Sequence, residues 1–369
     1  MAALRDTAAE WDVIVVGGGI IGCAIARELA RRGARTVVLE ARTAGAGATH
    51  ASAGVLAPFI EAPGEGPLHA LTVQSLAMYD EFVASVSHDA QTSVEFRRCG
   101  TLEVAADTAS AARLATLGAW ARSTGVDAQW VEAAEVGRLE PALGATEGGL
   151  LVPSHGYVRA MQLTGALVEA ARRHGATVHT GRRVDAIEHA GEGVTAMAGR
   201  ETYRAGTLVL AAGSWSGLLA PEMAVKPVRG QLLQLRWHGP PITRVLWSDR
   251  CYIVPWLDGT LLVGATVEDA GFDERVTVSG VRALVSAVSA LLPDVGEATF
   301  VEARAGLRPA TPSGLPIIQR SAEHPAVVHA TGHYRNGILL APLTARLVAE
   351  LVLEEVPGTF TARVPGTSG

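Results

Sequence analysis

The sequence lacks the cysteine pattern of disulfide-rich proteins and the basic runs of nucleic-acid-binding proteins. Its 369 residues include only three cysteines, at positions 23, 99 and 251, which are far apart and form no Cys-x-x-Cys pair. They predict neither a disulfide framework nor a cysteine-based metal site. Lys and Arg never occur in a run longer than a pair, and the formal net charge is −6. Nothing therefore indicates a nucleic-acid partner.

Long apolar segments are also missing. The longest one, residues 13–26, is shorter than a membrane-spanning helix and is interrupted by glycines. No basic segment of consequence precedes it, and Arg31 and Arg32 follow it, which is not the order of a secretory signal peptide. We therefore expect a cytoplasmic protein without a membrane partner.

Two local patterns resemble a metal site and a hydrolase active site, but the neighbouring residues argue against both. His329 and His333 are four residues apart, but they flank a strand end and a turn, where this spacing does not bring side chains together. No metal site is therefore expected. The segment Gly213–Gly217 is similar to the Gly-x-Ser-x-Gly turn of serine hydrolases, but Trp215 stands where the nucleophile would be.

The sequence does contain a core-forming composition and a β-α-β unit near its start. Hydrophobic residues make up 48% and charged residues 18%, which is typical of a globular protein, and the length allows two domains. Residues 12–16 and 36–40 read as short, apolar, β-branched strands of the kind buried on both faces of a parallel sheet. The helix between them is expected to end at Gly33.

The first strand leads into a turn with the G-x-G-x-x-G pattern, Gly17-Gly-Gly19-Ile-Ile-Gly22. Between a strand and a helix this pattern predicts dinucleotide binding. Gly17 permits the tight turn, Gly19 lets the backbone approach the pyrophosphate, and Gly22 lets helix and strand pack closely. The helix N-terminus offers free N–H groups to the phosphates. Glu40, which ends the second strand, is placed to accept hydrogen bonds from the adenosine ribose, which disfavours NADP.

Two later segments favour FAD over NAD. Residues 207–216 and 330–342 each combine an apolar strand with glycines. Together with the first turn they give three places where the backbone can approach a long, extended ligand closely, and NAD would not need the last one. An NAD-dependent dehydrogenase and a flavin-binding protein without catalytic activity remain as alternatives.

The rest of the chain predicts a mixture of helices and strands without internal repeats. Residues 41–67 are rich in Gly, Ala and Pro and are expected to form an ordered loop that lines a site. Pro342 lacks an N–H group, so we expect it in the first turn of the last helix. Helices are predicted at 68–88, 108–124, 159–174, 278–292 and 338–354, and strands at 100–104, 176–180, 183–188, 193–198, 201–205, 207–211, 231–236, 251–254, 260–263, 298–304, 315–319 and 326–329.

Over almost its whole length the chain resembles the D-amino acid oxidase superfamily of FAD-dependent oxidoreductases, and within it the glycine oxidases. The matching motifs occur in the same order along the chain, and the last two together are specific. They are the glycine turn, Glu40, residues 47–54, 210–216, 251–255, 262–266, 305–312 and 332–342.

This resemblance implies an α/β fold with a Rossmann-like FAD-binding domain and a second, β-rich α+β substrate-binding domain. The FAD-binding domain is expected to be discontinuous and the termini to be loose. The expected ranges are 12–85, 155–222 and 300–355 for the first domain, 86–154 and 223–299 for the second, and 1–11 and 356–369 for the termini.

The resemblance also implies that FAD is bound without a covalent link. Relatives that attach the flavin to a cysteine carry it near the position of Gly306, and this chain has no cysteine after Cys251. The residues expected to contact FAD are Gly17, Gly19, Ile20, Ile21, Gly22, Glu40, Ala41, Ala48, Thr49, Ala53, Gly54, Val55, Val184, Gly213, His333, Tyr334, Arg335, Asn336, Gly337, Ile338 and Leu339.

Arg308, Arg335 and Tyr252 are expected to face the substrate. Arg308 lies among small and apolar residues, and a planar guanidinium can hold both oxygens of a carboxylate. Arg335 has similar neighbours, whereas the role of Tyr252 rests mainly on the resemblance. Two positions depart from the glycine oxidase pattern: Arg250 replaces a histidine and Val267 replaces a methionine. Both are expected to border the pocket.

The implied activity is the oxidation of a small amino acid such as glycine, sarcosine or a small D-amino acid. Hydride transfer from Cα to flavin N5 would give an imine and then a 2-oxo acid and ammonia, while molecular oxygen would be reduced to hydrogen peroxide. A D-amino acid dehydrogenase, or a sarcosine- or proline-type amine oxidase passing electrons to another acceptor, is the alternative. The sequence does not determine the oligomeric state, and a homo-oligomer is one of the alternatives.

Overall fold

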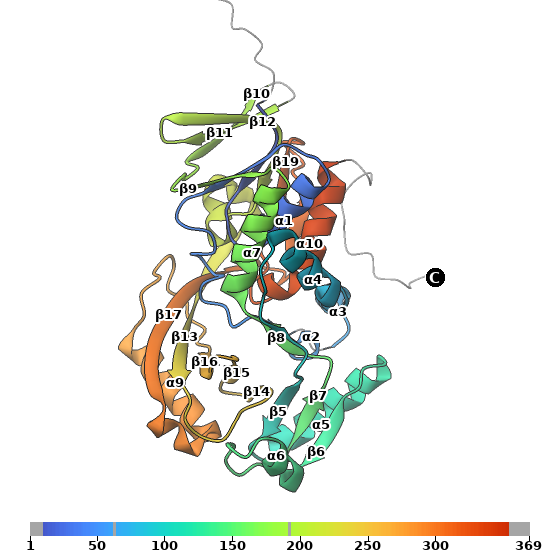
Figure 1. Ribbon diagram of the computed structural model, residues 1–369, viewed down its shortest axis with the longest axis vertical. Coiled ribbons are helices and arrows are strands. Elements are labelled where there is room, and N and C mark those ends of the chain that lie inside the picture. The colour runs from blue at the N-terminus through green and yellow to red at the C-terminus, as the bar shows by residue number, and fades with distance from the viewer. Residues whose placement is uncertain (1–9, 62–63, 191–192, 354–369) are drawn as a thin grey trace, which may run out of the picture.

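The computed structural model describes residues 10–61, 64–190 and 193–353. Strands in these ranges form two eight-stranded sheets and one three-stranded sheet. In Figure 1 the first large sheet and its helices make up the upper half of the molecule, and the second large sheet lies in the lower half. The expected α/β class is confirmed. The termini that we expected to be loose are residues 1–11 and 356–369. Residues 1–9 and 356–369 lie outside the described ranges, and Trp11 already begins the first strand.

The first large sheet has the order β10-β11-β12-β1-β2-β9, with β19 also pairing with β12 and β18 with β19. Its centre is buried on both faces because Val13–Val16 is a continuous apolar run, and Ile14 aligns with Val37 on one side and Leu208 on the other. The parallel strands are β1 (Trp11–Val16), β2 (Thr36–Glu40), β9 (Thr177–Thr180), β12 (Glu201–Leu210) and β19 (Val327–Thr331), and the antiparallel ones are β10 (Ala186–Ala190), β11 (Gly193–Ala198) and β18 (Ile317–Arg320).

Helix α1 packs against both α7 and α10 beside this sheet, and their apolar faces form one core with β1 and β19. Two expectations change here. Residues 201–205 and 207–211 form the single strand β12, and the predicted helix at 68–88 is divided at Met78. The helices of this half are α1 (Ile20–Arg31), α3 (Pro67–Ala77), α4 (Tyr79–Ala90), α7 (Ala160–Arg173) and α10 (Gly337–Val352).

The break at Met78 explains how α10 tolerates a proline. Pro342 lies five residues after Gly337, beyond the first turn where we expected it, and cannot donate to the Ile338 carbonyl four residues earlier. The hydroxyl of Tyr79, the first residue of α4, donates to that carbonyl instead. Ser75, near the end of α3, donates to the Leu339 carbonyl at 2.6 Å. Side chains from the broken helix therefore satisfy the carbonyls around the proline.

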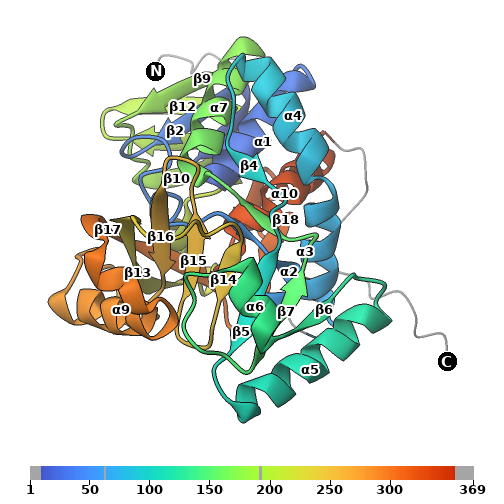
Figure 2. The same ribbon diagram turned by 60° about the horizontal axis from the view of Figure 1, so that its bottom comes forward.

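The second large sheet has the order β17-β13-β16-β15-β14-β5-β7-β6. Its two longest strands, β13 and β17, pair antiparallel from Lys226↔Ala310 to Arg236↔Thr299. Figure 2 shows α9 and α5 at opposite ends of this half. The strands are β5 (Thr101–Ala105), β6 (Gln129–Glu132), β7 (Gly148–Val152), β13 (Lys226–Arg236), β14 (Val245–Trp247), β15 (Tyr252–Pro255), β16 (Thr260–Gly264) and β17 (Thr299–Ala310), with helices α5 (Thr108–Ser123), α6 (Ala133–Leu139) and α9 (Val278–Leu291).

Short elements connect the two halves. The three-stranded sheet has the order β3-β8-β4. The short elements are β3 (Val55–Leu56), α2 (Pro58–Glu61), β4 (Phe96–Arg97), β8 (Gly156–Val158), η1 (Gly213–Trp215), α8 (Ser216–Leu219), η2 (Pro221–Met223) and η3 (Pro293–Glu297).

By strand pairing, residues 299–310 belong to the second sheet, whereas the expected division assigned residue 300 onward to the first domain; the division into domains remains a proposal.

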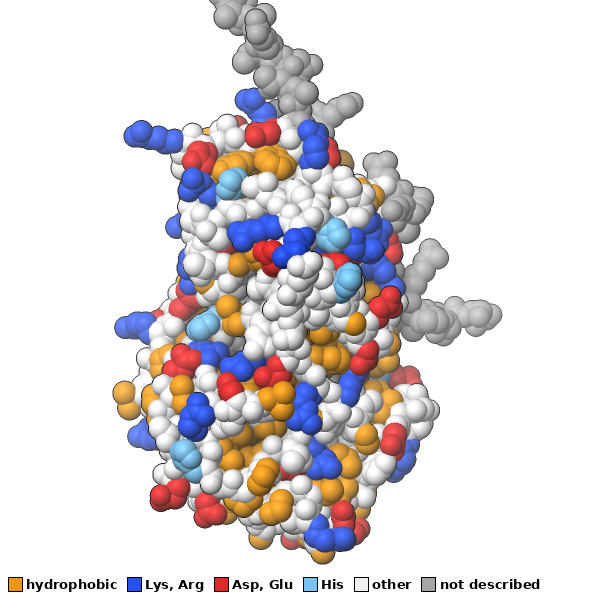
Figure 3. Space-filling model, in the orientation of Figure 1, with side chains coloured by type: hydrophobic (Ala, Val, Ile, Leu, Met, Phe, Trp, Pro, Cys, Tyr) orange, Lys and Arg blue, Asp and Glu red, His pale blue; other side chains and the backbone are white. Residues whose placement is uncertain are grey.

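The surface carries charges of both signs. On the face shown in Figure 3, Lys and Arg side chains are interspersed with Asp and Glu rather than gathered by sign. No helix within the described ranges is both long enough and apolar enough to cross a membrane.

Candidate active site

The glycine turn between β1 and α1 is required by packing as well as by function. Gly17 has φ +107°, and a Cβ there would lie 2.5 Å from the Ala211 carbonyl oxygen. A Cβ on Gly22 would lie 1.9 Å from the Gly17 oxygen. Gly19 is the N-cap of α1 and has no side-chain cap; the nearest atom to an added Cβ would be Thr49 Oγ1 at 3.5 Å. Thr49 Oγ1 accepts a hydrogen bond from the Ile20 N–H at 3.1 Å, and Ile21 beside it lines the cavity, so this helix N-terminus faces the cavity.

Glu40 lies beside this helix end. Its Oε2 accepts a hydrogen bond from the Gly18 N–H at 2.7 Å, and its Oε1 accepts one from the Arg42 N–H at 2.7 Å. The two backbone donors hold the carboxylate at the end of β2, where it lines a large cavity. An acceptor fixed in this way can bind a ribose hydroxyl.

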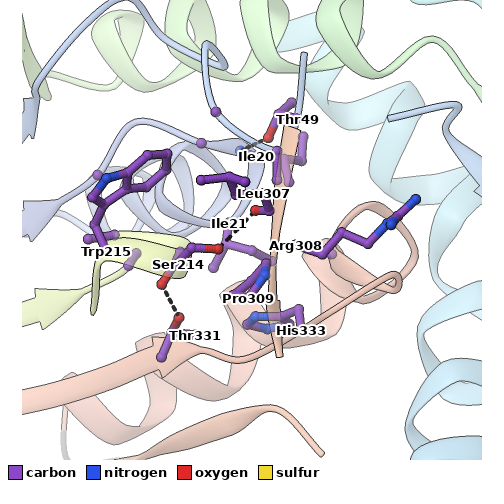
Figure 4. Close-up of a pocket in the computed structure, with 18 of the residues that line it drawn as sticks. Ile20, Ile21, Thr49, Ser214, Trp215, Leu307, Arg308, Pro309, Thr331 and His333 are labelled. Atoms are coloured by element: carbon purple, nitrogen blue, oxygen red, sulfur yellow. Dashed lines mark hydrogen bonds between the residues drawn. The ribbon is translucent and has the colours of Figure 1, made fainter. Parts of the chain in front are cut away.

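The cavity has a volume of about 890 Å³ and extends from the glycine turn to β17 and the start of α10. Figure 4 shows Ile20 and Ile21 from α1, Ser214 after β12, and Arg308 on β17 around the same space. Of the residues expected at a cofactor or substrate, those that line the cavity are Gly17, Gly19, Ile20, Ile21, Glu40, Ala41, Ala48, Thr49, Ala53, Gly54, Val55, Val184, Gly213, Tyr252, Arg308, His333, Tyr334, Arg335, Gly337 and Ile338.

Three expected cofactor residues do not line the cavity. Gly22 lies behind the turn, at the contact with Gly17. Asn336 is the N-cap of α10 and is 4% exposed, and Leu339 is 1% exposed on the helix that follows. The contacts of Gly22 and Leu339 favour packing roles, whereas the Asn336 Oδ1 is buried with no hydrogen-bond partner among the described residues.

The later glycine segments meet at the wall of the cavity. Gly213 has φ +55°, and an added Cβ would meet no atom within 4 Å. Thr331 Oγ1 donates to the Gly213 carbonyl at 3.0 Å, and Ser214 Oγ donates to the Leu307 carbonyl at 2.9 Å (Figure 4). Hydrogen bonds thus join the ends of β12 and β19 to β17, although these segments are far apart in sequence.

Arg308 extends from β17 away from Ile20 and Ile21 in Figure 4. Its Nη1 donates to the Thr266 carbonyl at 3.0 Å. The guanidinium packs over Gly230, where a Cβ would lie 2.2 Å from Nη2. Position 230, on the neighbouring strand β13, must therefore be glycine for the Arg308 guanidinium to lie where it does.

Tyr252, on β15, lines the same part of the cavity. A Cβ on Gly264 would lie 2.3 Å from its hydroxyl oxygen, so a second glycine makes room for a site side chain. Burial raises the pKa of Tyr252 to about 12, and the hydroxyl stays protonated near neutral pH. Its neighbour Cys251 is buried and does not line the cavity, as strand alternation predicts.

Comparison with known proteins agrees with this architecture. The family described as FAD dependent oxidoreductase matches residues 12–351. The chain is 35% identical to the glycine oxidase of Geobacillus kaustophilus, over 93% of each chain. The crystal structure of glycine oxidase from that organism superimposes with a TM-score of 0.90 at 34% identity, covering 93% of this chain and 95% of the other.

The chain belongs to the FAD-dependent oxidoreductase family. The resemblance and the FAD cofactor expected from the sequence are thereby confirmed. A further similar structure is an iminodiacetate oxidase from Chelativorans sp. BNC1, with a TM-score of 0.86 and 26% identity over 94% of this chain and 97% of the other.

The residues around the cavity fit FAD, the cofactor of this family. The start of α1, where Gly19 supplies no side-chain cap and Thr49 holds only the Ile20 N–H, offers N–H groups to phosphate oxygens, and the fixed Glu40 carboxylate offers an acceptor to a ribose. At the other end, Gly337 and Ile338 bring the N-terminus of α10 to the cavity. A long ligand with phosphates in its middle matches this distribution of donors and acceptors.

His333 is a neutral part of the wall in this FAD-dependent oxidoreductase. It is 4% exposed and its Nε2 lies 3.0 Å from Thr344 Oγ1. Burial lowers its pKa to about 3. His329, which is also buried, has its Nε2 3.9 Å from Glu222. Among the described residues, no group of three or more His, Cys, Asp or Glu side chains is arranged to hold a metal ion.

Glu61 is a site residue that the sequence did not single out. It ends α2, lines the cavity, and forms an ion pair with Arg335: Nη2 donates a hydrogen bond to Oε1 at 3.1 Å, and Nε lies 3.0 Å from Oε2. Burial raises the pKa of its carboxyl, while Arg335 and Arg308 oppose that rise. The only sequence signal was its position in the 41–67 segment, which was expected to line a site.

Two expected pocket residues lie elsewhere. Val267 is 61% exposed and does not line the cavity. Arg250 is exposed in the turn before β15 and does not line it either. The expectation that both positions border the pocket was wrong, because each side chain points to the surface from a loop next to a site strand.

Proposed function

We propose that the protein oxidises the carbon beside the amine of a small amino acid, with glycine, sarcosine and small D-amino acids as the substrate class. The amino acid loses two electrons and two protons to become an imine, which water converts to a 2-oxo acid and ammonia, or methylamine where the substrate is sarcosine. The names of the glycine oxidase relatives support this assignment. Oxygen is proposed as the electron acceptor, with hydrogen peroxide as its product.

The observation that carries the proposal is the position of Arg308. Its guanidinium faces the cavity and donates only to backbone carbonyls, at 3.0 Å to Thr266 and 3.4 Å to Arg229. No carboxylate of the described residues lies within ion-pairing distance of it. An arginine with free donors in a cavity is suited to hold the carboxylate of a substrate by two parallel hydrogen bonds.

Tyr252 complements Arg308 as a neutral donor. Because its hydroxyl stays protonated, it can donate to a carboxylate oxygen without adding charge. Two contacts to one carboxylate fix both the position and the rotation of a small substrate. Such positioning is a large part of catalysis when the reaction needs few proton transfers from the protein.

FAD binding is proposed through the residues that line the remainder of the cavity. Gly19 and the first N–H groups of α1 hold the pyrophosphate, and Glu40 holds the adenosine ribose. The α10 N-terminus, at Gly337, places partial positive charge near the flavin. When bound, FAD would supply the two-electron acceptor for the hydride that leaves the substrate Cα, and would pass both electrons to oxygen. We propose non-covalent binding, since no cysteine follows Cys251 in the sequence.

A D-amino acid dehydrogenase or a sarcosine- or proline-type amine oxidase, with an acceptor other than oxygen, is the alternative. The test is hydrogen peroxide release from the purified yellow protein with glycine, sarcosine, and panels of D- and L-amino acids, beside reduction of an artificial acceptor without oxygen. We expect peroxide with glycine or sarcosine and complete release of FAD on denaturation. Substrate-dependent reduction of the artificial acceptor without peroxide would favour the dehydrogenase, and flavin that stays with the denatured chain would contradict non-covalent binding.

A further inference from the structure

The substrate end of the cavity contains two arginines, and of these Arg335 is paired with a carboxylate whereas Arg308 donates only to backbone carbonyls. Arg335 uses Nε and Nη2 to hold both oxygens of Glu61, at 3.0 and 3.1 Å. These are the two N–H groups that form one edge of the guanidinium fork. Arg308 donates from Nη1 to backbone carbonyls and has no acidic partner among the residues that the structure describes.

The charges of Arg308, Arg335 and Glu61 are close enough to act on one another and on Tyr252. The Glu61 carboxyl interacts with both Arg335 and Arg308. The pKa of Tyr252 is raised first by burial and is further shifted by Arg308, Glu61 and Arg335. Two arginines and one glutamate leave a single net positive charge, because Tyr252 is neutral. A substrate whose amine is neutral and that has one carboxylate balances this charge, whereas a substrate with two carboxylates exceeds it.

The pair is held in place from both sides. Glu61 ends α2, and Phe59 in the same turn is 3% exposed and packs 4.9 Å from the His69 ring and 5.7 Å from the His155 ring, centroid to centroid. On the other side, the Tyr334 N–H donates to the Pro309 carbonyl at 2.9 Å and fixes the loop before α10. The Arg335 guanidinium also lies 5.9 Å from the Trp247 ring centroid. Arg335 therefore has support that does not depend on Glu61.

We propose that Glu61 determines the charge of the substrate that the cavity accepts. By occupying Arg335 it leaves Arg308 as the single free guanidinium, so that amino acids with one carboxylate bind and those with two are rejected. This inference rests on the proposed function, since it assumes that Arg308 binds the substrate carboxylate. Glu61 acts through Arg335 and is a specificity-determining, positioning residue.

The test compares two pairs of compounds that differ by one carboxylate. Methoxyacetate and diglycolate are unreactive ligands whose dissociation constants can be measured from the absorbance change of the bound flavin in the FAD-loaded enzyme. Sarcosine and iminodiacetate are the corresponding amines, compared by kcat/KM. The variants are Glu61→Gln, which removes the charge and keeps the shape, Glu61→Ala, and the double variant Glu61→Gln with Arg335→Met. Glu274→Gln is the matched control, since Glu274 lines the same cavity but pairs with Arg42 at 2.9 Å.

In the unmodified enzyme we expect methoxyacetate to bind at least about 10-fold more tightly than diglycolate. Glu61→Gln should increase the affinity for diglycolate by about 10- to 100-fold, the worth of one charge-assisted bidentate contact. Methoxyacetate affinity should change by less than about threefold, which is small on this scale. The double variant should lose the gain, and Glu274→Gln should keep the original ratio. Damage to the fold cannot produce such a gain, so a gain separates specificity from a structural role.

Three results would overturn the proposal. In the first, Glu61→Gln or Glu61→Ala retains FAD but keeps the original ratio of the two affinities. In the second, the unmodified enzyme binds diglycolate as tightly as methoxyacetate, a result that needs no variant to fold. In the third, the unmodified enzyme binds neither ligand and oxidises neither sarcosine nor glycine; this removes the proposed function as well, and so differs from the first two.

Discussion

The two ends of the cavity are built in different ways. The end near α1 is made from neighbours in sequence: one glycine turn, the helix that follows it, and Glu40 at the end of the next strand. The other end gathers Glu61 from α2, Tyr252 from β15, Arg308 from β17 and Arg335 from the loop before α10. The first is a local backbone motif and the second exists only in the folded chain. The first should therefore control whether FAD binds, and the second which substrate is oxidised.

The largest effect that would test this division is expected at Arg308. Removing one partner of a buried, charged pair costs about 3–5 kcal/mol, so Arg308→Ala should lower kcat/KM for glycine or a small D-amino acid by roughly two to four orders of magnitude. FAD content, measured by absorbance, should stay normal. Arg308→Lys should recover only part of the activity, because an ammonium cannot reproduce the planar fork.

Simple alkylamines provide the control for this prediction. They lack a carboxylate, so they should be poor substrates whose low turnover hardly changes in Arg308→Ala. An alkylamine oxidised as efficiently as glycine by the unmodified enzyme would show that carboxylate recognition is not what selects the substrate.

An intermediate effect is expected at the other end, from Glu40→Ala. Loss of a charge-assisted hydrogen bond to the ribose costs about 1.5–3 kcal/mol, which weakens FAD affinity by about one to two orders of magnitude. Because Glu40 is distant from Arg308 along the cavity wall, turnover of the variant saturated with FAD should be nearly unchanged. Titration of the apoprotein with FAD measures the affinity. Unchanged FAD affinity, or a loss of turnover at full FAD occupancy, would contradict the separation of the two ends.

The smallest effect concerns a buried neutral histidine in the second half of the molecule. His155 is 0% exposed, its Nδ1 lies 2.8 Å from Thr101 Oγ1, and burial lowers its pKa to about 3. The unfolded chain binds a proton below about pH 6.5, whereas the folded chain does not until about pH 3. Stability should therefore fall as the pH falls through this window, by about 1–2 kcal/mol for this group between pH 7 and 5.

Urea unfolding at both pH values measures this loss. His155→Gln should be less stable at pH 7 but should show a smaller loss on acidification. His333 has the same depressed pKa in the first half, so part of the acid sensitivity should remain in His155→Gln. An unchanged pH dependence in this variant would mean that His155 is not the group that takes up the proton.

The parts of this protein that depend on backbone geometry over a few residues could be predicted from the sequence. The strand-turn-helix was readable because only glycine fits the positive φ of Gly17 and the close contacts of Gly17 and Gly22. Strands and helices followed from apolar periodicity, which reports burial directly. Arg308 and Tyr252 were identified with the help of a resemblance, and both line the cavity.

The pairing of side chains from distant segments could not be predicted and became visible in the folded chain. Glu61 and Arg335 are 274 positions apart, and no local pattern marks them as a pair. The proline in α10 is tolerated because Ser75 from α3 and Tyr79 from α4 donate to its neighbouring carbonyls. Val267 departs from the glycine oxidase pattern, yet its side chain is on the surface. A sequence motif fixes local backbone geometry, whereas the charge and reach of a site depend on contacts between elements that only packing brings together.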